Sequence, residues 1–377
     1  MLLKNGTALL FEQGGFVSQD IRVKNGKISE MAQILSPEAG EEVVDASGCF
    51  ITPGLIDAHS HICISEEGGG NEGDDCCDYS GTATPELEVL DGLYPFDRAV
   101  KDCMRAGVTT TCVAPGSDGV VGGVASVIQL TGHVADEMLV RRMAAMKCSV
   151  GENPKKANYN FCSRMGVAFQ LRKAFDAALD YKHRKEEAKK NGTYFCKDRG
   201  MEHMLLVLDK KMPVHMHAHR SDDICTAVRI AQEYGFDMVI LHGTDAIPVA
   251  DYLARFNYPV VVGPSMSSRS KPELLGKTFA TAGMLAKAGV KVCICSDHDV
   301  TPMYFLTTYV GLAVQHGMDE LEALKAVTRN PAEVLGIQDR KGDLKVGLDA
   351  DIVLWDGNPL DYNTRTRQVY IQGTAQM

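Results

Sequence analysis

The histidines are the sequence feature that most constrains how this chain can fold. Seven of the eleven lie in four short apolar segments: LIDAHSH (55–61), PVHMHAH (213–219), MVILHG (238–243) and VCICSDH (292–298). Each segment is typical of a strand whose histidines stand at its C-terminal end, where parallel α/β sheets and barrels carry their active sites. Alternate residues of a strand project to one face, so His59 and His61 can reach the same ion. The distribution therefore predicts a metal site.

The composition limits the class of protein and of partner. With 377 residues and 45% hydrophobic content, the chain can bury one large core, alone or with a small accessory domain. No run of eighteen apolar residues occurs, and residues 1–15 lack the features of a signal peptide, so we expect a cytoplasmic protein. The formal net charge of −10 argues against nucleic-acid or membrane binding, because both favour a basic surface. A small-molecule substrate is the expected partner.

Most of the twelve cysteines stand singly in apolar, strand-like runs, where cysteine behaves as a small hydrophobic residue. We therefore expect reduced thiols. Cys76 and Cys77 differ, because they are adjacent in a Gly/Asp-rich stretch at residues 66–81. This pair is the one that we expect to be open to oxidation.

Strand-like and helical segments alternate between about residues 50 and 335, which predicts a parallel sheet closed into an eight-stranded barrel, placed at 53–342. Gly107 and Gly289 each end a helix directly before a β-rich run. The two ends of the chain instead alternate in the manner of short β strands, with KNG turns in residues 1–49. Because neither end has enough strands to bury a core, we expect residues 1–52 and 343–377 to form one small composite β-sandwich.

The strand ends supply the donors that a hydrolytic metal site needs, which are neutral imidazoles and carboxylates. We expect His59 and His61 to bind from the first strand, and His217 and His242 from two later strands. Asp297 supplies a carboxylate at the last strand. Metal coordination lowers the pKa of a bound water toward neutrality, so Asp297 is the predicted general base as well as a ligand.

A second metal would need a bridging anion from the fourth strand, where the run MKCSVGENPK offers two candidates. Lys147 would have to be carboxylated by carbon dioxide, whereas Glu152 carries a carboxylate already. We prefer Glu152, because it falls at the C-terminal end of the expected strand while Lys147 lies near the middle.

Other residues at the same end of the barrel are candidates for substrate binding. His219 lies just beyond its strand, whereas His215 lies deeper and is expected to be a layer residue of the barrel interior. The glycine-rich segment 113–123 can bring backbone N–H groups to a ligand. Two arginines that follow strands could hold a substrate carboxylate. The predicted substrate-binding residues are His219, Gly116, Ser117, Arg164 and Arg220.

These residues together resemble the amidohydrolase superfamily, most closely its imidazolonepropionase-like and prolidase-like branch. The resemblance rests on PGLIDAHSH, HAH, LHG, SDH and the closing GDLKVGLDADIVLWDGNP, and it covers essentially the whole chain. It implies a distorted (β/α)8 TIM barrel with a small β-sandwich from both termini, and one or two divalent metals, zinc before iron or manganese. It also implies the ligands His59, His61, His217, His242 and Asp297. Many binuclear members have a carboxylated lysine at the fourth strand, for which this chain shows no clear equivalent.

The resulting hypothesis is a metal-dependent hydrolase that cleaves the C–N bond of a small cyclic amide, an N-acyl amino acid or a dipeptide through a metal-activated water. One alternative is a mononuclear deaminase of a nucleobase-like ring, which would need an additional glutamate and histidine near the metal. Another is a scaffold protein without catalysis, which the complete ligand set disfavours. The superfamily often forms dimers or larger assemblies, so a homo-oligomer is a further expectation.

Overall fold

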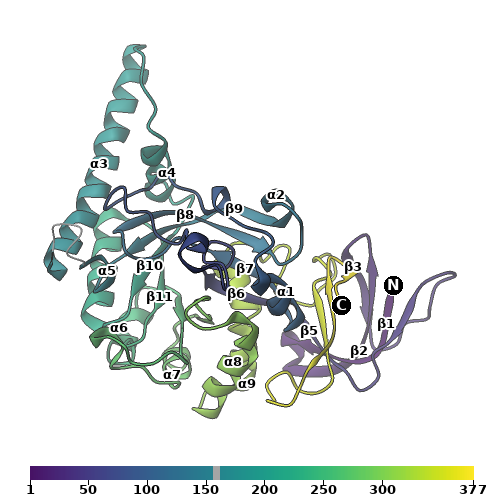
Figure 1. The fold of residues 1–377 in the computed structure, drawn as a ribbon. Helices are drawn as coiled ribbons and strands as arrows, with labels where there is room; N and C mark the ends of the chain where they lie inside the picture. Colours follow the sequence, from purple (N-terminus) through teal and green to yellow (C-terminus); the bar gives the residue numbers. More distant parts are fainter. Residues whose placement is uncertain (156–161) are drawn as a thin grey trace.

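Eight strands form a nearly closed barrel sheet in the computed structural model, which describes residues 1–155 and 162–377. The strands follow one another around the sheet in chain order, and neighbours are parallel except at β8, which runs antiparallel to β7 and β9. Helices cover the outside of the barrel (Figure 1). The barrel strands are β6 (Leu55–Ser60), β7 (Val108–Val113), β8 (Val121–Gln129), β9 (Leu139–Ser149), β10 (Val214–Ala218), β11 (Met238–His242), β12 (Val260–Val262) and β13 (Val292–Ile294).

Strand β10 shows how the sequence periodicity orients its side chains. Val214, Met216 and Ala218 belong to the main hydrophobic core, together with apolar residues of the surrounding helices. His215 and His217 alternate with them and therefore face the barrel interior. The helices are α1 (Arg98–Arg105), α2 (Ala135–Met138), α3 (Arg164–Asn191), α4 (Arg199–Leu208), α5 (Ser221–Tyr234), α6 (Ala250–Ala254), α7 (Thr281–Lys287), α8 (Leu306–Gln315), α9 (Glu320–Lys325) and α10 (Arg329–Val334).

Strand β8 corrects one part of the sequence analysis, because the end of the glycine-rich segment 113–123 belongs to a strand. The loop is limited to residues 114–120, and β7 turns back directly into β8 without a helix between them. Gly123 explains why glycine occurs inside a strand: its φ is +120°, and a Cβ there would lie 2.7 Å from the Leu87 carbonyl oxygen. The β-branched residues Val121, Val124 and Val127 are fully buried.

The two edge strands of the barrel sheet, β6 and β13, are joined by a short piece of backbone between α9 and α10. The Ile294 N–H donates to the Ala326 carbonyl oxygen at 2.9 Å, and the Ile56 N–H donates to that of Val327 at 2.8 Å. The Asp57 carboxylate of β6 also accepts a hydrogen bond from the Ser296 N–H beyond β13, at 3.0 Å. The barrel is therefore closed at this seam through an inserted segment rather than a ladder between β6 and β13.

Strands from both ends of the chain form a separate sheet, as predicted, although they join in one mixed sheet. Strand β1 pairs with β2 on one side and with β4 and β5 on the other, and β5 continues the sheet to β14. The predicted boundaries between this β domain and the barrel, at 52/53 and 342/343, stay predictions. The strands are β1 (Leu2–Leu10), β2 (Gly15–Lys24), β3 (Lys27–Ala32), β4 (Val43–Asp45), β5 (Phe50–Pro53), β14 (Ile352–Trp355), β15 (Thr366–Ile371) and β16 (Thr374–Ala375).

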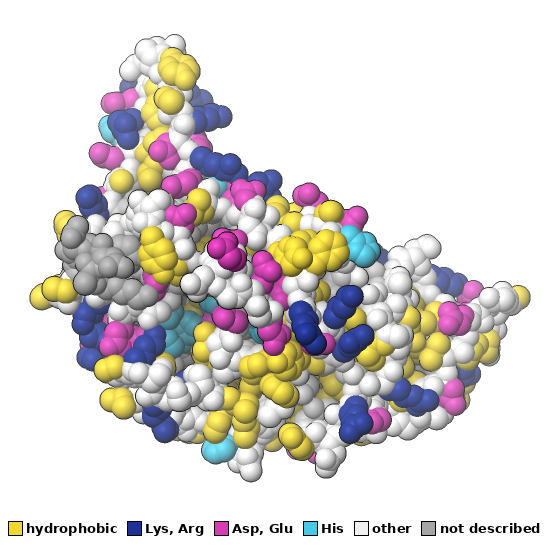
Figure 2. Space-filling model, in the orientation of Figure 1, with side chains coloured by type: hydrophobic (Ala, Val, Ile, Leu, Met, Phe, Trp, Pro, Cys, Tyr) yellow, Lys and Arg dark blue, Asp and Glu magenta, His cyan; other side chains and the backbone are white. Residues whose placement is uncertain are grey.

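Helix α3 projects from the barrel as an arm, and α4 packs against its base (Figure 1). The Ser163 side chain caps the first turn of α3 by accepting a hydrogen bond from the Gly166 N–H at 3.1 Å. Figure 2 shows basic, acidic and apolar side chains side by side along the arm. In residues 1–155 and 162–377, every helix is too short or too polar to cross a bilayer.

The barrel and the terminal sheet meet at Gly107, which follows α1. Its φ is +90°, and a Cβ there would lie 2.6 Å from the Trp355 ring. Trp355, the single tryptophan of the chain, is buried and donates from its Nε1–H to the Thr52 hydroxyl at 2.9 Å. The close approach of β14 to the end of α1 therefore requires glycine at this position.

Replacing Gly107 by alanine should destabilise the protein more than the same change at Gly289. Gly289 has a φ of +86°, and a Cβ added there would meet no other atom within 4 Å, so G289A should lower the free energy of unfolding by about 1 kcal/mol through backbone strain alone. G107A adds a collision with Trp355 and should cost about 3 kcal/mol. Denaturant titrations followed by Trp355 fluorescence measure both, and equal losses would contradict the packing argument.

Candidate metal centre

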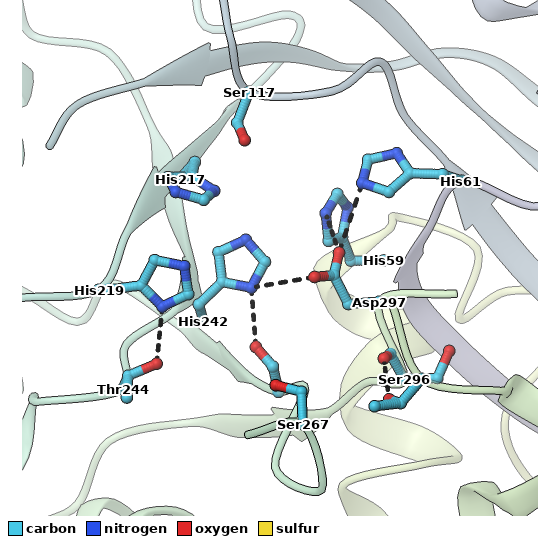
Figure 3. A network of polar contacts seen from close by, with 12 residues as sticks. His59, His61, Ser117, His217, His219, His242, Thr244, Ser267, Ser296 and Asp297 are labelled. Carbon is cyan, nitrogen blue, oxygen red and sulfur yellow. Dashed lines mark hydrogen bonds and ion pairs between the residues drawn. The ribbon is translucent and has the colours of Figure 1, made fainter. Parts of the chain in front are cut away.

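The first group of metal donors combines two histidines of β6 with a carboxylate beyond β13. His59 Nε2 lies 3.2 Å from Asp297 Oδ1, and His61 Nε2 lies 3.4 Å from the same oxygen. All three residues are buried, and their donor atoms lie within 4.8 Å of one another. Figure 3 shows the three side chains pointing toward a common centre. The sequence-predicted residues His59, His61 and Asp297 are thus brought together.

The second group of donors consists of His217, His219 and His242, which are also buried and within 4.8 Å of one another. The His219 and His242 rings are stacked, with centroids 4.5 Å apart. In the β10–β11 ladder His242 is the partner of Ala218, whose side chain packs in the outer core. A regular strand would therefore direct His242 outward, but its φ of +74° turns the side chain toward His217.

Hydrogen bonds at Nδ1, which donates to a carbonyl oxygen in His61 and His242, fix the orientation of three histidines. Nδ1 of His61 lies 2.7 Å from the Ala114 carbonyl oxygen, and Nδ1 of His242 lies 2.7 Å from that of Gly263. Nδ1 of His219 lies 2.7 Å from the Thr244 hydroxyl. Contacts of this kind leave Nε2 free to face a metal, which is the usual arrangement around bound ions.

Several buried polar atoms in the described part of the chain have no hydrogen-bond partner, and five of them belong to these two groups. Both ring nitrogens of His59 and of His217 are unpartnered, and so is Oδ1 of Asp297. Leaving such atoms buried and unpaired costs free energy. Nitrogen and carboxylate oxygen donors together suit zinc, iron or manganese, so the residues fit a divalent metal.

The electrostatic state of the donors also fits metal binding. Burial holds the pKa values of His59, His217 and His219 well below their ordinary value and lowers that of His242 to about 4. These histidines are therefore neutral, as ligands must be. Burial raises the pKa of Asp297, but the neighbouring His242, His59 and His61 lower it by more, so that it lies well below its ordinary value.

The two candidates for a bridging ligand lie in different surroundings. Lys147 is completely buried, third from the C-terminal end of β9 rather than near its middle, and its Nζ donates to the Pro115 carbonyl oxygen at 2.9 Å. In the β9–β10 ladder it is the partner of His215, two residues before His217. Glu152 lies beyond the strand, and its carboxylate accepts from the Glu273 N–H at 3.2 Å. It belongs to neither donor group.

A cavity of about 280 Å³ opens between the two donor groups, and Figure 2 shows histidine side chains within a recess on this face. His219, Gly116 and Ser117 line the cavity, and their contact with a substrate stays a prediction. Arg164 and Arg220 are not among the lining residues. Arg164 Nε donates to the Asp223 carboxylate at 2.9 Å, and Arg220 pairs with Asp222 at 2.7 Å, so both guanidinium groups have carboxylate partners elsewhere.

A second hollow of about 320 Å³ lies between α8 and residues 359–364. Its described lining residues include hydroxyl groups and one carboxylate but no histidine. The cavity between the donor groups is therefore the better candidate for the active site, because it alone of the two has a metal-binding donor set.

One acidic residue beside the second group, Glu273, was not predicted from the sequence. Glu273 lies in the short helix η7 (Pro272–Leu274) after β12, and its side chain is buried. Its Oε1 lies 3.9 Å from His217 Nε2 and 3.8 Å from His219 Nε2. The segment SSRSKPELLGK around it has no strand-like or helical periodicity that would direct one side chain to the site. Pro272 indicates a helical first turn but not where that turn lies.

Known proteins resemble this chain over most of its length. Residues 50–375 match the family model described as "Amidohydrolase family". An amidohydrolase named tasK from Hapsidospora irregularis is 29% identical over 388 residues, which cover 95% of this chain and 40% of that relative. The chain therefore spans less than half the length of this relative. Imidazolonepropionase from Thermoplasma volcanium is 24% identical over 391 residues, covering 94% of this chain and 89% of the relative.

Solved structures show the same fold. The crystal structure of an amidohydrolase from Thermotoga maritima MSB8 is 39% identical, with a TM-score of 0.96 over 100% of this chain and 99% of the other. A prolidase complexed with N-methylphosphonate-L-proline is 17% identical, with a TM-score of 0.62 over 100% of this chain and 98% of the other. At that identity the likeness to the prolidase shows the shared fold alone.

Cys76 and Cys77 line the same cavity and pack against Gly116, where a Cβ would lie 2.3 Å from the Cys77 sulfur and 3.0 Å from that of Cys76. A hydrogen bond from the Cys76 thiol lowers the pKa of Cys77 to about 6. Because the thiolate is the nucleophile, Cys77 should already be reactive near neutral pH.

Iodoacetamide should therefore label Cys77 with a half-maximal rate near pH 6, as measured by mass spectrometry of peptides. The exposed Cys196 supplies a comparison within the same sample. Cys76→Ala removes the donor and should move the profile to higher pH, whereas Cys76→Ser retains a donor and should move it less. A profile that is identical in all three proteins would exclude this role for Cys76.

Proposed function

Because the chain belongs to the amidohydrolase family, we propose that it hydrolyses the C–N bond of a small cyclic amide, an N-acyl amino acid or a dipeptide with the help of bound divalent metal. The proposal rests above all on the two buried donor groups that face one cavity. A cavity of about 280 Å³ suits a small-molecule substrate. Zinc is the proposed metal, with iron or manganese as alternatives, because imidazole and carboxylate donors suit all three.

We assign His59, His61 and Asp297 to one ion, and His217 and His242 to a second. A bound divalent ion supplies a Lewis acid for the substrate carbonyl and acidifies water. The Asp297 carboxylate can accept a proton from the attacking water and later return it to the leaving nitrogen. Asp57 helps to position Asp297. Oδ2 of its carboxylate accepts hydrogen bonds from the N–H of Ser296 at 3.0 Å and from the Ser296 hydroxyl at 2.5 Å, and Ser296 directly precedes Asp297 in the chain.

Lys147 is our candidate for the bridging ligand, in place of Glu152. Burial lowers the pKa of Lys147, which increases the fraction of neutral amine. Carbon dioxide adds to a neutral amine with loss of one proton and gives a carbamate, which is an anion with two oxygen donors. The Glu152 carboxylate instead accepts a hydrogen bond from the backbone N–H of Glu273.

For the substrate, we retain His219, Gly116 and Ser117 as contacts, because all three line the cavity. We no longer assign substrate binding to Arg164 and Arg220, since carboxylate partners already hold them. The acidic net charge still disfavours nucleic acid or an anionic membrane as a partner, and a homo-oligomer stays an expectation.

Purified protein should contain one to two equivalents of metal and should hydrolyse members of a panel of cyclic amides, N-acyl amino acids and dipeptides. Asp297→Asn should lower kcat by about 100-fold or more while much of the metal remains bound, because the amide cannot accept the proton. Elemental analysis and initial rates measure the two effects. Asp319→Asn provides a matched control, since Asp319 caps α9 and asparagine caps helices equally well.

Three outcomes would count against these assignments. Protein that holds no metal and takes up none would contradict metal-dependent hydrolysis. Full activity of D297N would contradict the role of Asp297 as general base. Ammonia release from nucleobases without cleavage of any amide in the panel would identify a deaminase instead.

A second comparison separates the two bridging candidates. Lys147→Ala should lower the metal content by about half, because loss of a bridging ligand weakens the second ion, whereas Glu152→Gln should retain most of the metal. Elemental analysis of both variants, prepared in parallel, measures this difference. Halved metal in E152Q together with full metal in K147A would restore Glu152 as the bridge.

A further inference from the structure

The two donor groups differ in charge. The first contains the carboxylate of Asp297, whereas the second consists of three imidazoles and no carboxylate. A divalent cation in a buried site needs compensating negative charge, because the desolvation of an uncompensated ion is costly, and the single charge of a Lys147 carbamate would be shared between two ions. In the described structure, the Glu273 carboxylate lies beside the second group.

Glu273 is held in place by a reciprocal pair of hydrogen bonds with Glu152. The Glu152 N–H donates to Glu273 Oε2 at 3.0 Å, and the Glu273 N–H donates to Glu152 Oε2 at 3.2 Å. A Cβ at Gly151 would lie 3.1 Å from the same Glu273 oxygen, so the backbone approaches closely there. Oε2 of Glu273 thus accepts a backbone hydrogen bond, whereas Oε1 faces His217 and His219.

The position of Oε1 suits a shared ion. Two donors on a tetrahedral zinc lie about 3.3 Å apart, and wider donor angles extend this toward about 4 Å. The Oε1 atom lies 3.9 Å from His217 Nε2 and 3.8 Å from His219 Nε2, within this range. It also forms an ion pair with Lys271, whose Nζ is 2.7 Å away.

We propose that Glu273 is a carboxylate ligand of a divalent cation held with His217, His219 and His242, in which case His219 binds the ion rather than the substrate. This inference rests on the proposed metal dependence but concerns only the second donor group. If Glu273 is a ligand, Lys271 and the cation compete for Glu273 Oε1. Glu152, which the sequence had suggested as a ligand, is then a positioning residue that holds Glu273 in place.

Metal titration of the apoprotein tests the proposal without an activity assay. Co²⁺ and Zn²⁺ are titrated in competition with a chelating dye, which gives stoichiometry and affinity, and the visible spectrum of Co²⁺ reports its ligands. Glu273→Gln should weaken one equivalent by about 10-fold or more and alter its Co²⁺ spectrum. The equivalent bound by His59, His61 and Asp297 should be unaffected.

Lys271→Met is the matched control, because it breaks the same ion pair from the other side and leaves the carboxylate in place. If Glu273 is a ligand, K271M should bind the second equivalent at least as tightly as the wild type. Equal weakening in K271M and E273Q would instead show that the ion pair matters only for structure, and would overturn the proposal.

The remaining outcomes are distinguishable. An E273Q protein with wild-type stoichiometry, affinities and Co²⁺ spectrum would overturn the role of Glu273 and leave the proposed function intact. Wild-type protein that binds no metal would overturn the proposed function itself. Circular dichroism of the apoproteins checks folding; if E273Q is unfolded, Glu273→Asp keeps the charge on a shorter side chain and should show weakened binding of the same equivalent.

Discussion

Asp57 connects the closure of the barrel with the geometry of the metal centre. Its buried carboxylate accepts hydrogen bonds from the backbone N–H and hydroxyl of Ser296, and from the His59 N–H. One side chain thereby joins the strand that carries His59 to the segment that carries Asp297. Burial raises the pKa of Asp57 to about 7, which shows how strongly this carboxylate is withdrawn from water. The placement of the first donor group depends on this contact.

The site is built where regular strands end, and irregular backbone completes it. His242 and Asp297 have positive φ values of 74° and 56°, which are uncommon for residues other than glycine. At His242 this conformation turns inward a side chain that the strand pattern would direct outward. Strained backbone of this kind is found where the surrounding structure fixes a functional group, as the buried strands do here.

Sequence reasoning succeeded where a side chain's direction follows from local periodicity. The spacing of His59 and His61, and the alternation in β10, were enough to predict that these histidines converge, and alternating strands and helices predicted the barrel. Local periodicity does not predict where a strand begins or ends, nor the path of a loop. Lys147 was placed wrongly within its strand because β9 begins earlier than its apolar pattern suggests. Glu273 reaches the histidines only through the path of residues 263–280, for which the sequence has no periodic signal.

The seam of the barrel gives the two donor groups different mechanical roles. His217 and His242 stand on β10 and β11, which are already joined by a ladder of hydrogen bonds. His59 and Asp297 stand on opposite sides of the seam, where the inserted Ala326–Val327 backbone, the Asp57 contacts and a hydrogen bond from the His61 N–H to the His298 carbonyl oxygen connect the sheet edges without a ladder. An ion at the first group would therefore clamp the barrel shut, so that chemistry and the integrity of the fold would share one set of ligands there.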